Sequence, residues 1–340
     1  MKKFLLIIPI IIIIVIVYQG NSTEKKLKDL GYTKKEIKEI LKEPEKVQKI
    51  ILKNKYNKDL INILTNKDYK EDNLSLYLDY YLKYKDAKIN YVISIVNNGL
   101  TDKKYSDFLG KLTQEKYFIK ENTDRYLKYN KDAKATIKDI NCNLDYEYYT
   151  HTIKTDTKKD TLMLVNKYYY LDEGYTPSDL KKLPDEYNIG KNNTLREDAY
   201  DAFIKMSNAA KLDNISIKNA SGYRNYEYQV NLYNNYIKKD GKKAADTYSA
   251  RPGFSEHQTG LATDINKIDS SFENTDAFKW LSKNAYKYGF ILRFPKNKES
   301  LTGYKYEPWH YRYVGEDVAK KITKENLTLE EYYAYYVNAN

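Results

Sequence analysis

Two histidines and two carboxylates fall in short segments whose spacing is suited to metal chemistry. His257 precedes Asp264 by seven positions, with Gly260 between them. Glycine adopts a positive φ or a tight turn more readily than other residues, so the chain can reverse after His257 and continue as a short strand that carries Asp264. Near the end of the chain, His310 follows Glu307 by three positions. These segments stand out because the chain has only three histidines.

Two histidines and one carboxylate are the donor set of a catalytic zinc site, in which a fourth position stays open for water. We therefore predict that His257, Asp264 and His310 bind Zn²⁺. A zinc ion lowers the pKa of its bound water to roughly 7, and Glu307 could take the proton as a general base and pass it to a leaving amine. The alternative is that both histidines are ordinary polar residues satisfied by hydrogen bonds, which is the commoner role of an isolated His-x6-Asp pair.

The motifs around these residues resemble those of a known family. Ser221-Gly222-Tyr223-Arg224 comes first, residues 255–264 read Ser-x-His-x-x-Gly-x-Ala-x-Asp, and Glu307-Pro308-Trp309-His310 follows. Three motifs in this order and spacing resemble the zinc-dependent D-alanyl-D-alanine carboxypeptidases of the VanY type, over roughly residues 161–323. The resemblance implies hydrolysis of the last peptide bond of a peptidoglycan stem peptide.

Three further side chains are candidates for substrate binding. A guanidinium binds a carboxylate through a bidentate pair of hydrogen bonds, which an enzyme that removes one C-terminal residue requires, and the resemblance assigns Arg224 to the substrate or the intermediate. A surface ion pair is the alternative for this residue. Gln229, one to two turns after Arg224, could steady the oxyanion through its amide. Ser255 could donate a hydrogen bond to the substrate.

These residues together lead us to expect a zinc metallopeptidase that acts as a D,D-carboxypeptidase. An L,D-carboxypeptidase that acts on tetrapeptide stems is an alternative that no residue excludes. A non-catalytic wall-binding protein with the same fold is the alternative from another class, and the intact Glu307 argues against it. An endopeptidase that cuts cross-links is a further alternative.

The first residues of the chain predict a membrane segment. Lys2 and Lys3 are followed by an uninterrupted apolar run, residues 4–18. This run has the length of a signal-peptide core and is shorter than the roughly 20 residues of a full span. The absence of alanine from the weak cleavage site at residues 20–22 favours an uncleaved membrane anchor, residues 1–22. We expect the catalytic domain outside the membrane, and a secreted protein if the segment is cleaved.

Composition limits the partners of the chain. The net charge of +11 favours anionic partners, which for a protein of the cell envelope are wall polymers and lipid head groups. Nucleic acid is disfavoured, because the basic residues are spread among acidic ones without a dense arm or a binding motif. Cys142 is the only cysteine, so the fold must rest on packing and the metal.

Two regions with different residue patterns follow the first segment. Residues 23–160 are polar and patterned at helical spacing, which predicts a helical accessory or stalk region. Residues 81–84, Tyr-Leu-Lys-Tyr, are echoed by the same sequence at 126–129, so an internal repeat is expected there. Residues 161–323 are predicted to form an α+β zinc carboxypeptidase domain, with a small antiparallel sheet flanked by helices, and 324–340 a C-terminal tail.

Local patterns in the α+β region predict its individual elements. Helices are expected at 196–211, 226–237 and 277–288, with a terminal helical region at 317–336. Strands are expected at 162–171, 215–218, 261–265, 290–294 and 311–314.

Overall fold

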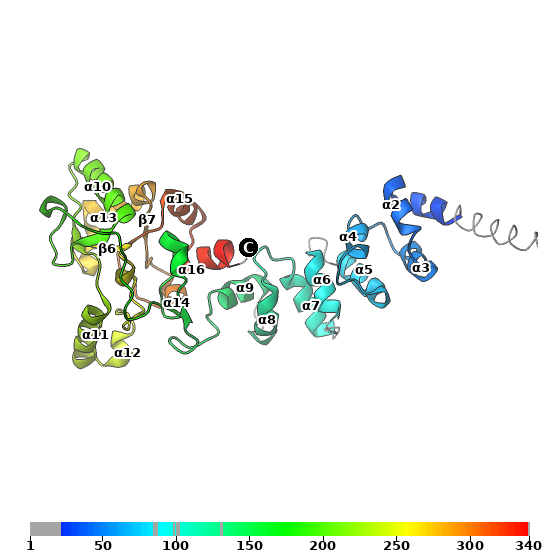
Figure 1. Cartoon of the computed structure of the whole chain (residues 1–340), viewed down its shortest axis with the longest axis horizontal. Helices are drawn as coiled ribbons and strands as arrows, with labels where there is room; N and C mark the ends of the chain where they lie inside the picture. Colours follow the sequence, from blue (N-terminus) through cyan, green and yellow to red (C-terminus); the bar gives the residue numbers. More distant parts are fainter. Residues whose placement is uncertain (1–21, 84–87, 98, 100–102, 130–131, 339–340) are drawn as a thin grey trace, which may run out of the picture. The chain divides into compact units, whose positions relative to one another are not determined.

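The computed structural model describes residues 22–83, 88–97, 99, 103–129 and 132–338 (Figure 1). Its contacts divide the chain into two compact units, residues 1–137 and 138–340. Residues 138–160, assigned from the sequence to the helical region, therefore lie in the second unit. None of the helices within the described residues has the length and apolar character needed to span a membrane. The apolar run predicted to be a membrane anchor lies outside the described residues.

The described part of the first unit consists of short helices and turns. The helices are residues 22–29, α2 (Lys34–Ile40), α3 (Glu45–Lys53), α4 (Leu60–Leu64), α5 (Leu74–Lys83), α6 (Ile89–Asn97), α7 (Lys103–Leu112), α8 (Thr123–Tyr129) and α9 (Ala133–Asn141), which runs into the second unit. Single 3-10 turns, Glu71–Asn73 and Lys120–Asn122, lead into α5 and α8. A shared apolar core, which includes Leu27, Ile40 and Tyr77, holds the helices through α6 together.

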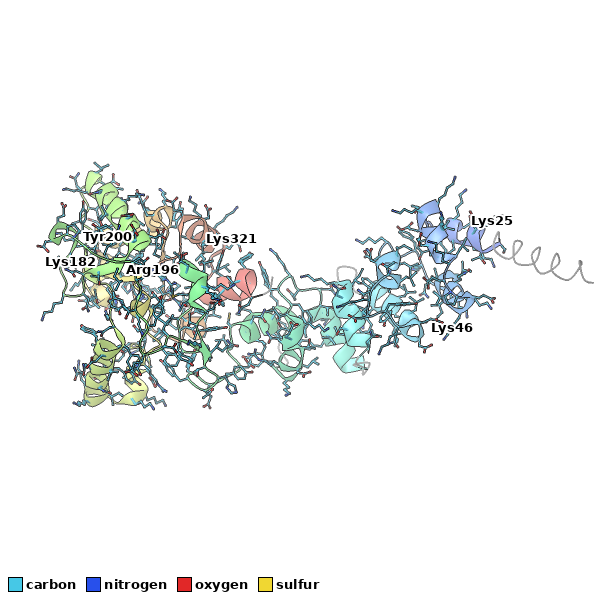
Figure 2. The ribbon with its side chains drawn as sticks, viewed as in Figure 1. Lys25, Lys46, Lys182, Arg196, Tyr200 and Lys321 are labelled. Atoms are coloured by element: carbon cyan, nitrogen blue, oxygen red, sulfur yellow. The ribbon has the colours of Figure 1, made fainter. Side chains whose placement is uncertain are left out.

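Two helices of the first unit begin in a similar way, and basic side chains lie on its surface. The turn before α5 is held by a hydrogen bond from the Lys70 amide to the Tyr77 hydroxyl (3.3 Å), and the turn before α8 by one from the Ile119 amide to the Tyr126 hydroxyl (3.1 Å). These two helix starts are similarly built, but they match Tyr77 with Tyr126 and so have a different register from the predicted repeat, which matched Tyr81 with Tyr126. Basic side chains such as Lys46, which pairs with an aspartate at 2.7 Å, lie on the solvated surface of these helices (Figure 2).

The second unit contains a four-stranded antiparallel sheet in the order β5-β6-β8-β7. Its strands are β5 (Asn219–Ser221), β6 (Ala262–Ile265), β7 (Phe290–Leu292) and β8 (His310–Tyr313). The register pairs Asp264 of β6 with Ser221 on one neighbouring strand and with His310 on the other. Two short ladders accompany the sheet, β1 (Ile153–Lys154) with β2 (Tyr169–Tyr170), and β3 (Leu180–Lys182) with β4 (Thr194–Arg196).

The helices of the second unit flank this sheet and bury its apolar side chains. They are α10 (Glu197–Leu212), α11 (Tyr226–Asp240), α12 (Lys242–Ala245), α13 (Asp276–Asn284), α14 (Glu299–Thr302), α15 (Glu316–Glu325) and α16 (Leu329–Tyr332), followed by a π-turn, Tyr333–Val337. The 3-10 turns are Thr157–Leu162, Asp185–Tyr187, Glu256–Thr259, Ser270–Asn274 and Ala285–Tyr288. The apolar stripe of α10, including Phe203 and Met206, joins Leu261 and Ile265 of the β6 segment in one core. The α+β class with a small antiparallel sheet is confirmed for this unit.

Local patterns predicted the helices better than the strands. The helices at 196–211, 226–237 and 277–288 are confirmed within a few residues. The strand at 215–218 is wrong, because these residues form a loop and the strand begins at Asn219. Only Tyr169 and Tyr170 of the expected strand 162–171 form a ladder. A short apolar run forms a strand only where a partner strand lies beside it and hydrogen-bonds its backbone N–H and C=O groups. The local sequence does not specify that partner.

The C-terminal residues are part of the core. Leu329 and Tyr333 pack with Leu164, Ile291 and neighbouring apolar side chains. Helix α16 begins at a capping box formed by Thr328 and Glu331. Residues 328–337, which the sequence suggested to be a tail, therefore belong to the packed body of the second unit.

Candidate metal centre

His257 is held by a 3-10 turn that ends in a glycine. The turn, Glu256–Thr259, stops at Gly260, which has a φ of +69°. A Cβ at this glycine would lie 2.9 Å from the Arg196 side chain, so both the backbone and the space around it favour glycine. The Nδ1 atom of His257 lies 2.7 Å from the carbonyl oxygen of Gly222. With Nδ1–H donating to this carbonyl, Nε2 carries the lone pair of the ring.

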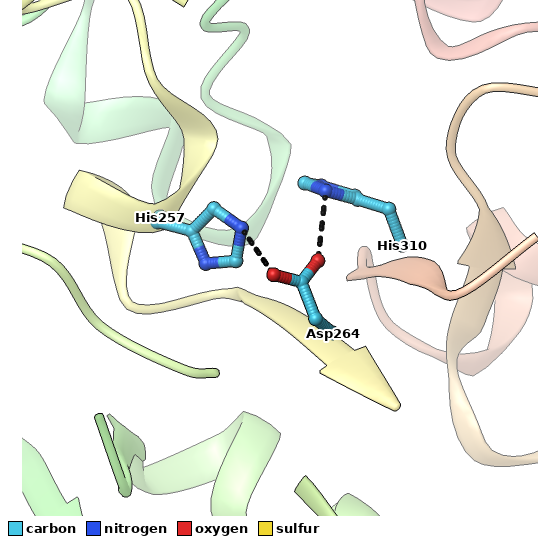
Figure 3. A group of neighbouring side chains, drawn as sticks. All are labelled: His257, Asp264 and His310. Atoms are coloured by element: carbon cyan, nitrogen blue, oxygen red, sulfur yellow. Dashed lines mark ion pairs between the residues drawn. The ribbon is translucent and has the colours of Figure 1, made fainter. Parts of the chain in front are cut away.

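Asp264 and His310 meet because β6 and β8 are adjacent and in register. Their Cα atoms are direct partners in the ladder. The Asp264 carboxylate lies between the two imidazoles, with Oδ2 3.4 Å from His257 Nε2 and Oδ1 3.3 Å from His310 Nδ1. Figure 3 shows the three side chains pointing toward one another from the turn and the two strands.

The three side chains fit a zinc ion. Their ligand atoms all lie within 4.8 Å of one another, and all three residues are buried. Ligand atoms at the usual zinc distances of about 2.0–2.2 Å in a tetrahedral arrangement are about 3.4 Å apart. Each imidazole lies at about this distance from one Asp264 oxygen, although the two contacts use different oxygens of the carboxylate. Asp264 Oδ1 is a buried oxygen without a hydrogen bond, which is the state expected of a ligand atom. No other such group of three occurs among the residues described.

His151, the third histidine, lies outside this centre. Its side chain is exposed, stacks on Tyr146 at 3.9 Å and contacts the Thr150 hydroxyl at 3.0 Å. The structure thus brings together the two histidines predicted to be ligands and leaves the remaining one on the surface.

The two buried imidazoles differ in their affinity for a proton. Burial, assisted by the positive charge of Arg224, lowers the pKa of His257 to about 4. Burial alone would also lower the pKa of His310, but its contacts with Asp264 and Glu256 outweigh this effect and raise the pKa to about 9. Burial likewise opposes ionisation of Asp264, yet the neighbouring His257 and Arg224 hold its pKa well below the usual range. In the metal-free site a proton therefore resides on His310.

Glu307 lies beside the ligand group. Its amide donates to the Phe294 carbonyl (3.1 Å), and its Oε2 lies 3.5 Å from His310 Nδ1. Burial raises the pKa of its carboxyl to about 8, which is the range suited to a group that exchanges protons near neutral pH. The predicted base is thus close to the predicted metal position without being one of the three ligands.

Arg224 faces the predicted metal ligand Asp264. Its guanidinium donates to Asp264 Oδ2 at 2.5 Å and to the Ser221 hydroxyl at 2.9 Å. Its backbone amide donates to the His257 carbonyl (3.2 Å), so the segment that follows β5 is tied to the turn that carries this histidine. The exposed surface-pair alternative for Arg224 does not apply, because its partner is buried.

A cavity of about 500 Å³ opens over this centre. Gln229 and Ser255 both line it and both are buried. One N–H of the Gln229 amide donates to the Ala250 carbonyl (2.8 Å), while its Oε1 has no hydrogen bond. Aromatic side chains, Tyr236 and Trp309 among them, line the remaining wall.

A group of charged residues behind His310 escaped the sequence analysis. Glu256, Arg293, Arg312 and Glu330 are all buried and ion-paired with one another. Charged residues are rarely buried unless paired, so arginines inside the apolar segments 290–294 and 311–314 were the signal that could have revealed this group.

Comparisons with known proteins bear on the identity of this centre. The sequence profile described as "VanY: D-alanyl-D-alanine carboxypeptidase" matches residues 192–316. YodJ of Bacillus subtilis (strain 168), named as a carboxypeptidase by inference, is 42% identical over 217 residues, which cover 59% of this chain and 79% of that protein. This chain belongs to the VanY family.

Relatives of this VanY-family chain have different activities in their names. The bifunctional D-Ala-D-Ala dipeptidase and D-Ala-D-Ala carboxypeptidase VanXYC of Enterococcus gallinarum is 33% identical over 185 residues, covering 52% of this chain and 95% of that protein. The solved structure of the LdcB LD-carboxypeptidase, described as revealing peptidoglycan recognition, is 42% identical with a TM-score of 0.51. It covers 55% of this chain and 92% of the solved chain.

Proposed function

We propose that this chain is a zinc-dependent carboxypeptidase that hydrolyses the terminal peptide bond of peptidoglycan stem peptides, with D-alanyl-D-alanine ends as its substrate. The arrangement of His257, Asp264 and His310, with Glu307 beside them, is the observation that carries this proposal. Zinc, when bound by these three residues, supplies the positive charge that acidifies a water molecule and polarises a carbonyl.

Glu307 takes up and delivers the proton in this proposal. Its carboxylate accepts a proton from the attacking water and donates it to the leaving amine of the terminal residue. Burial raises the pKa of this carboxyl in the metal-free protein, and the positive charge of a bound zinc ion would lower it again, so the group can take the proton as a carboxylate and return it as an acid. The distance of 3.5 Å between Glu307 Oε2 and His310 Nδ1 supports this role, because a metal-bound water and a substrate carbonyl would both lie beside the ligand group.

Arg224 and the polar residues of the cavity bind the substrate in this proposal. The guanidinium of Arg224, already fixed by Ser221 and Asp264, presents its remaining donors to a carboxylate or to a developing oxyanion. Ser255 adds a hydroxyl donor on the cavity wall, whereas the unpaired atom of Gln229 is its Oε1, an acceptor for a substrate N–H rather than the oxyanion donor expected from the sequence.

An L,D-carboxypeptidase that trims tetrapeptide stems is the second candidate. The similarity to the LdcB LD-carboxypeptidase favours it, because the identity of 42% extends over 92% of that structure. Both candidates need the same metal, base and carboxylate recognition, and differ in the residue on the amino side of the scissile bond, including its configuration.

Defined stem peptides distinguish these candidates. The zinc-loaded protein is incubated with tri-, tetra- and pentapeptide stems, and the products are weighed by mass spectrometry, with Glu307→Gln as the inactive control. Conversion of the pentapeptide to the tetrapeptide, without further shortening, is the expected result. Conversion of the tetrapeptide to the tripeptide supports the L,D activity. Cleavage of neither stem, or cleavage only of cross-linked dimers, would reject the carboxypeptidase.

The place of action follows from this substrate. Peptidoglycan stems lie outside the membrane, so the second unit acts there in this proposal, attached through the apolar run at residues 4–18 or released if that segment is cleaved. The basic first unit then faces the anionic polymers of the wall.

A further inference from the structure

A buried carboxylate lies behind the metal ligand His310, on the side of the ring away from the metal position. Glu256 Oε2 is 3.4 Å from His310 Nε2, whereas the ring's other nitrogen, Nδ1, faces Asp264. This contact is long for a hydrogen bond. Neither of its two atoms has another hydrogen-bond partner among the described residues. The two atoms therefore face each other without a competing partner among these residues.

The other oxygen of Glu256 is occupied by two guanidinium groups. Its Oε1 accepts from Arg293 Nε at 2.7 Å and from an Arg312 terminal nitrogen at 2.9 Å. Arg312 is itself fixed by donating to the backbone carbonyls of Thr161 and Met163. A carboxylate with one oxygen clamped in this way has little freedom to rotate, so the direction of its second oxygen is set by the two arginines.

A further ion pair connects Arg293 to helix α16. Arg293 donates through both terminal nitrogens to the two oxygens of Glu330 on α16, at 2.9 and 2.5 Å. Asn166 also donates to Glu330, at 3.2 Å. A fork-to-fork pair of this kind fixes both planes, so Glu330 determines the orientation of the guanidinium that holds Glu256.

The four residues joined by these ion pairs have balanced charges and are buried. Its two carboxylates and two guanidinium groups are between 0% and 4% exposed. Because two guanidinium groups donate to one oxygen of Glu256, its side chain is a charged acceptor, and its other oxygen faces the His310 ring.

An acceptor in this position defines the state of the ligand. A histidine that donates one ring N–H to a carboxylate keeps the lone pair of the other nitrogen for the metal, and such a partner also fixes the plane of the ring. With Nε2–H directed to Glu256, His310 presents Nδ1 toward Asp264 and the metal position. A substitution that keeps the shape of Glu256 but removes its charge would leave this tautomer without a charged acceptor.

We propose that Glu256 is a positioning residue for the metal ligand His310, and that Glu330 of α16 holds Glu256 in place through Arg293. This inference rests on the zinc site of the proposed function. Helix α16 lies beyond the residues that the VanY profile matches, 192–316. Under this proposal it supports the metal centre without contributing a ligand.

Three single substitutions in the full chain test this role. Glu256→Gln keeps the shape and removes the charge that faces His310, and Glu330→Gln weakens the fork that holds Arg293. Glu331→Gln is the matched control, because Glu331 is the next residue of the same helix, is equally buried and is paired with Lys298 at 3.1 Å. Glutamine at this position can still complete the capping box with Thr328.

Zinc affinity is measured by competition with a chromophoric chelator, and the cobalt(II)-substituted proteins are compared by their visible absorption, which reports the ligand geometry. We expect Glu256→Gln to weaken zinc binding by about 10- to 100-fold and to alter the cobalt spectrum. Glu330→Gln should give a smaller loss in the same direction, above about threefold. Glu331→Gln should bind zinc as the unmodified protein does, even if its unfolding temperature falls.

Each other outcome overturns a defined part of this inference. Unchanged zinc affinity and cobalt spectrum in folded Glu256→Gln would remove the positioning role alone. An equal loss in Glu330→Gln and Glu331→Gln would show that general destabilisation causes the effect. If Glu256→Gln does not fold, the comparison of Glu330→Gln with Glu331→Gln decides by itself. Failure of the unmodified protein to bind zinc would instead overturn the metal site, and this inference with it.

Discussion

Replacing Glu307 by glutamine should make the metal-free protein more stable and the enzyme inactive. Burial raises the pKa of the Glu307 carboxyl from 4.5 to about 8, whereas in the unfolded chain it returns to its ordinary value. Between these two values the folded state binds more protons than the unfolded state, so the free energy of unfolding falls as the pH rises. Each pH unit of this difference costs about 1.36 kcal/mol, which amounts to roughly 3 kcal/mol at pH 7.

Glutamine has nearly the shape of the protonated carboxyl and does not ionise. The metal-free Glu307→Gln protein should therefore equal the unmodified protein in stability near pH 4.5 and exceed it by roughly 3 kcal/mol at pH 7. With zinc restored, the variant should keep the metal and lose turnover by about 100- to 10,000-fold, the usual contribution of a general base. A gain in stability and a loss of activity from one substitution are expected where a functional group is buried against its preference.

Denaturant unfolding of the second unit at several pH values measures the first effect, and hydrolysis of stem peptides measures the second. Glu299→Gln is the control, because Glu299 is an exposed carboxyl on α14 and its replacement should change neither quantity. Equal stability of Glu307→Gln and the unmodified protein at pH 7 would refute the burial argument. Full turnover would show that another group takes the proton, and loss of zinc would make Glu307 a ligand.

Three further predictions concern the ligands and the substrate. Zinc must displace the proton of His310, whose pKa is raised to about 9, but none from His257, whose pKa is lowered to about 4. Calorimetry between about pH 5 and 6.5 should therefore show zinc affinity rising about tenfold per pH unit, and a flat profile would place no proton on His310. Metal analysis should find that His257→Ala loses zinc and that His151→Ala, a surface substitution, retains it; retention by both would reject the ligand set. Values of kcat/KM should show that amidated stems are poor substrates and that Arg224→Ala discriminates little between acid and amide, because both changes remove the same charge-assisted contact. Equal cleavage of acid and amide by the unmodified enzyme would exclude Arg224 from carboxylate recognition.

The sequence by itself was enough to predict the metal ligands and the longer helices of the second unit. With only three histidines in the chain, His257 and His310 could be assigned from the residues that follow or precede them. The turn at Gly260 followed from the backbone freedom of glycine, and the structure confirms it with a φ of +69°. Helix α10 followed from apolar residues spaced at the helical period. All of these features depend on residues within a few positions of one another, so neighbouring residues contain the information.

Only the tertiary structure decided how these residues meet. The ladder between β6 and β8 places Asp264 opposite His310, and no local pattern specifies which strands pair. The contacts from Glu256 to Arg293 and from Arg293 to Glu330 each join residues 37 positions apart. A charged side chain is stable in the interior only when such a partner removes the cost of its desolvation, and that partner is set by the path of the whole chain. For this reason the residues predicted to bind the metal were readable in the sequence, whereas the buried charged residues behind His310 were not.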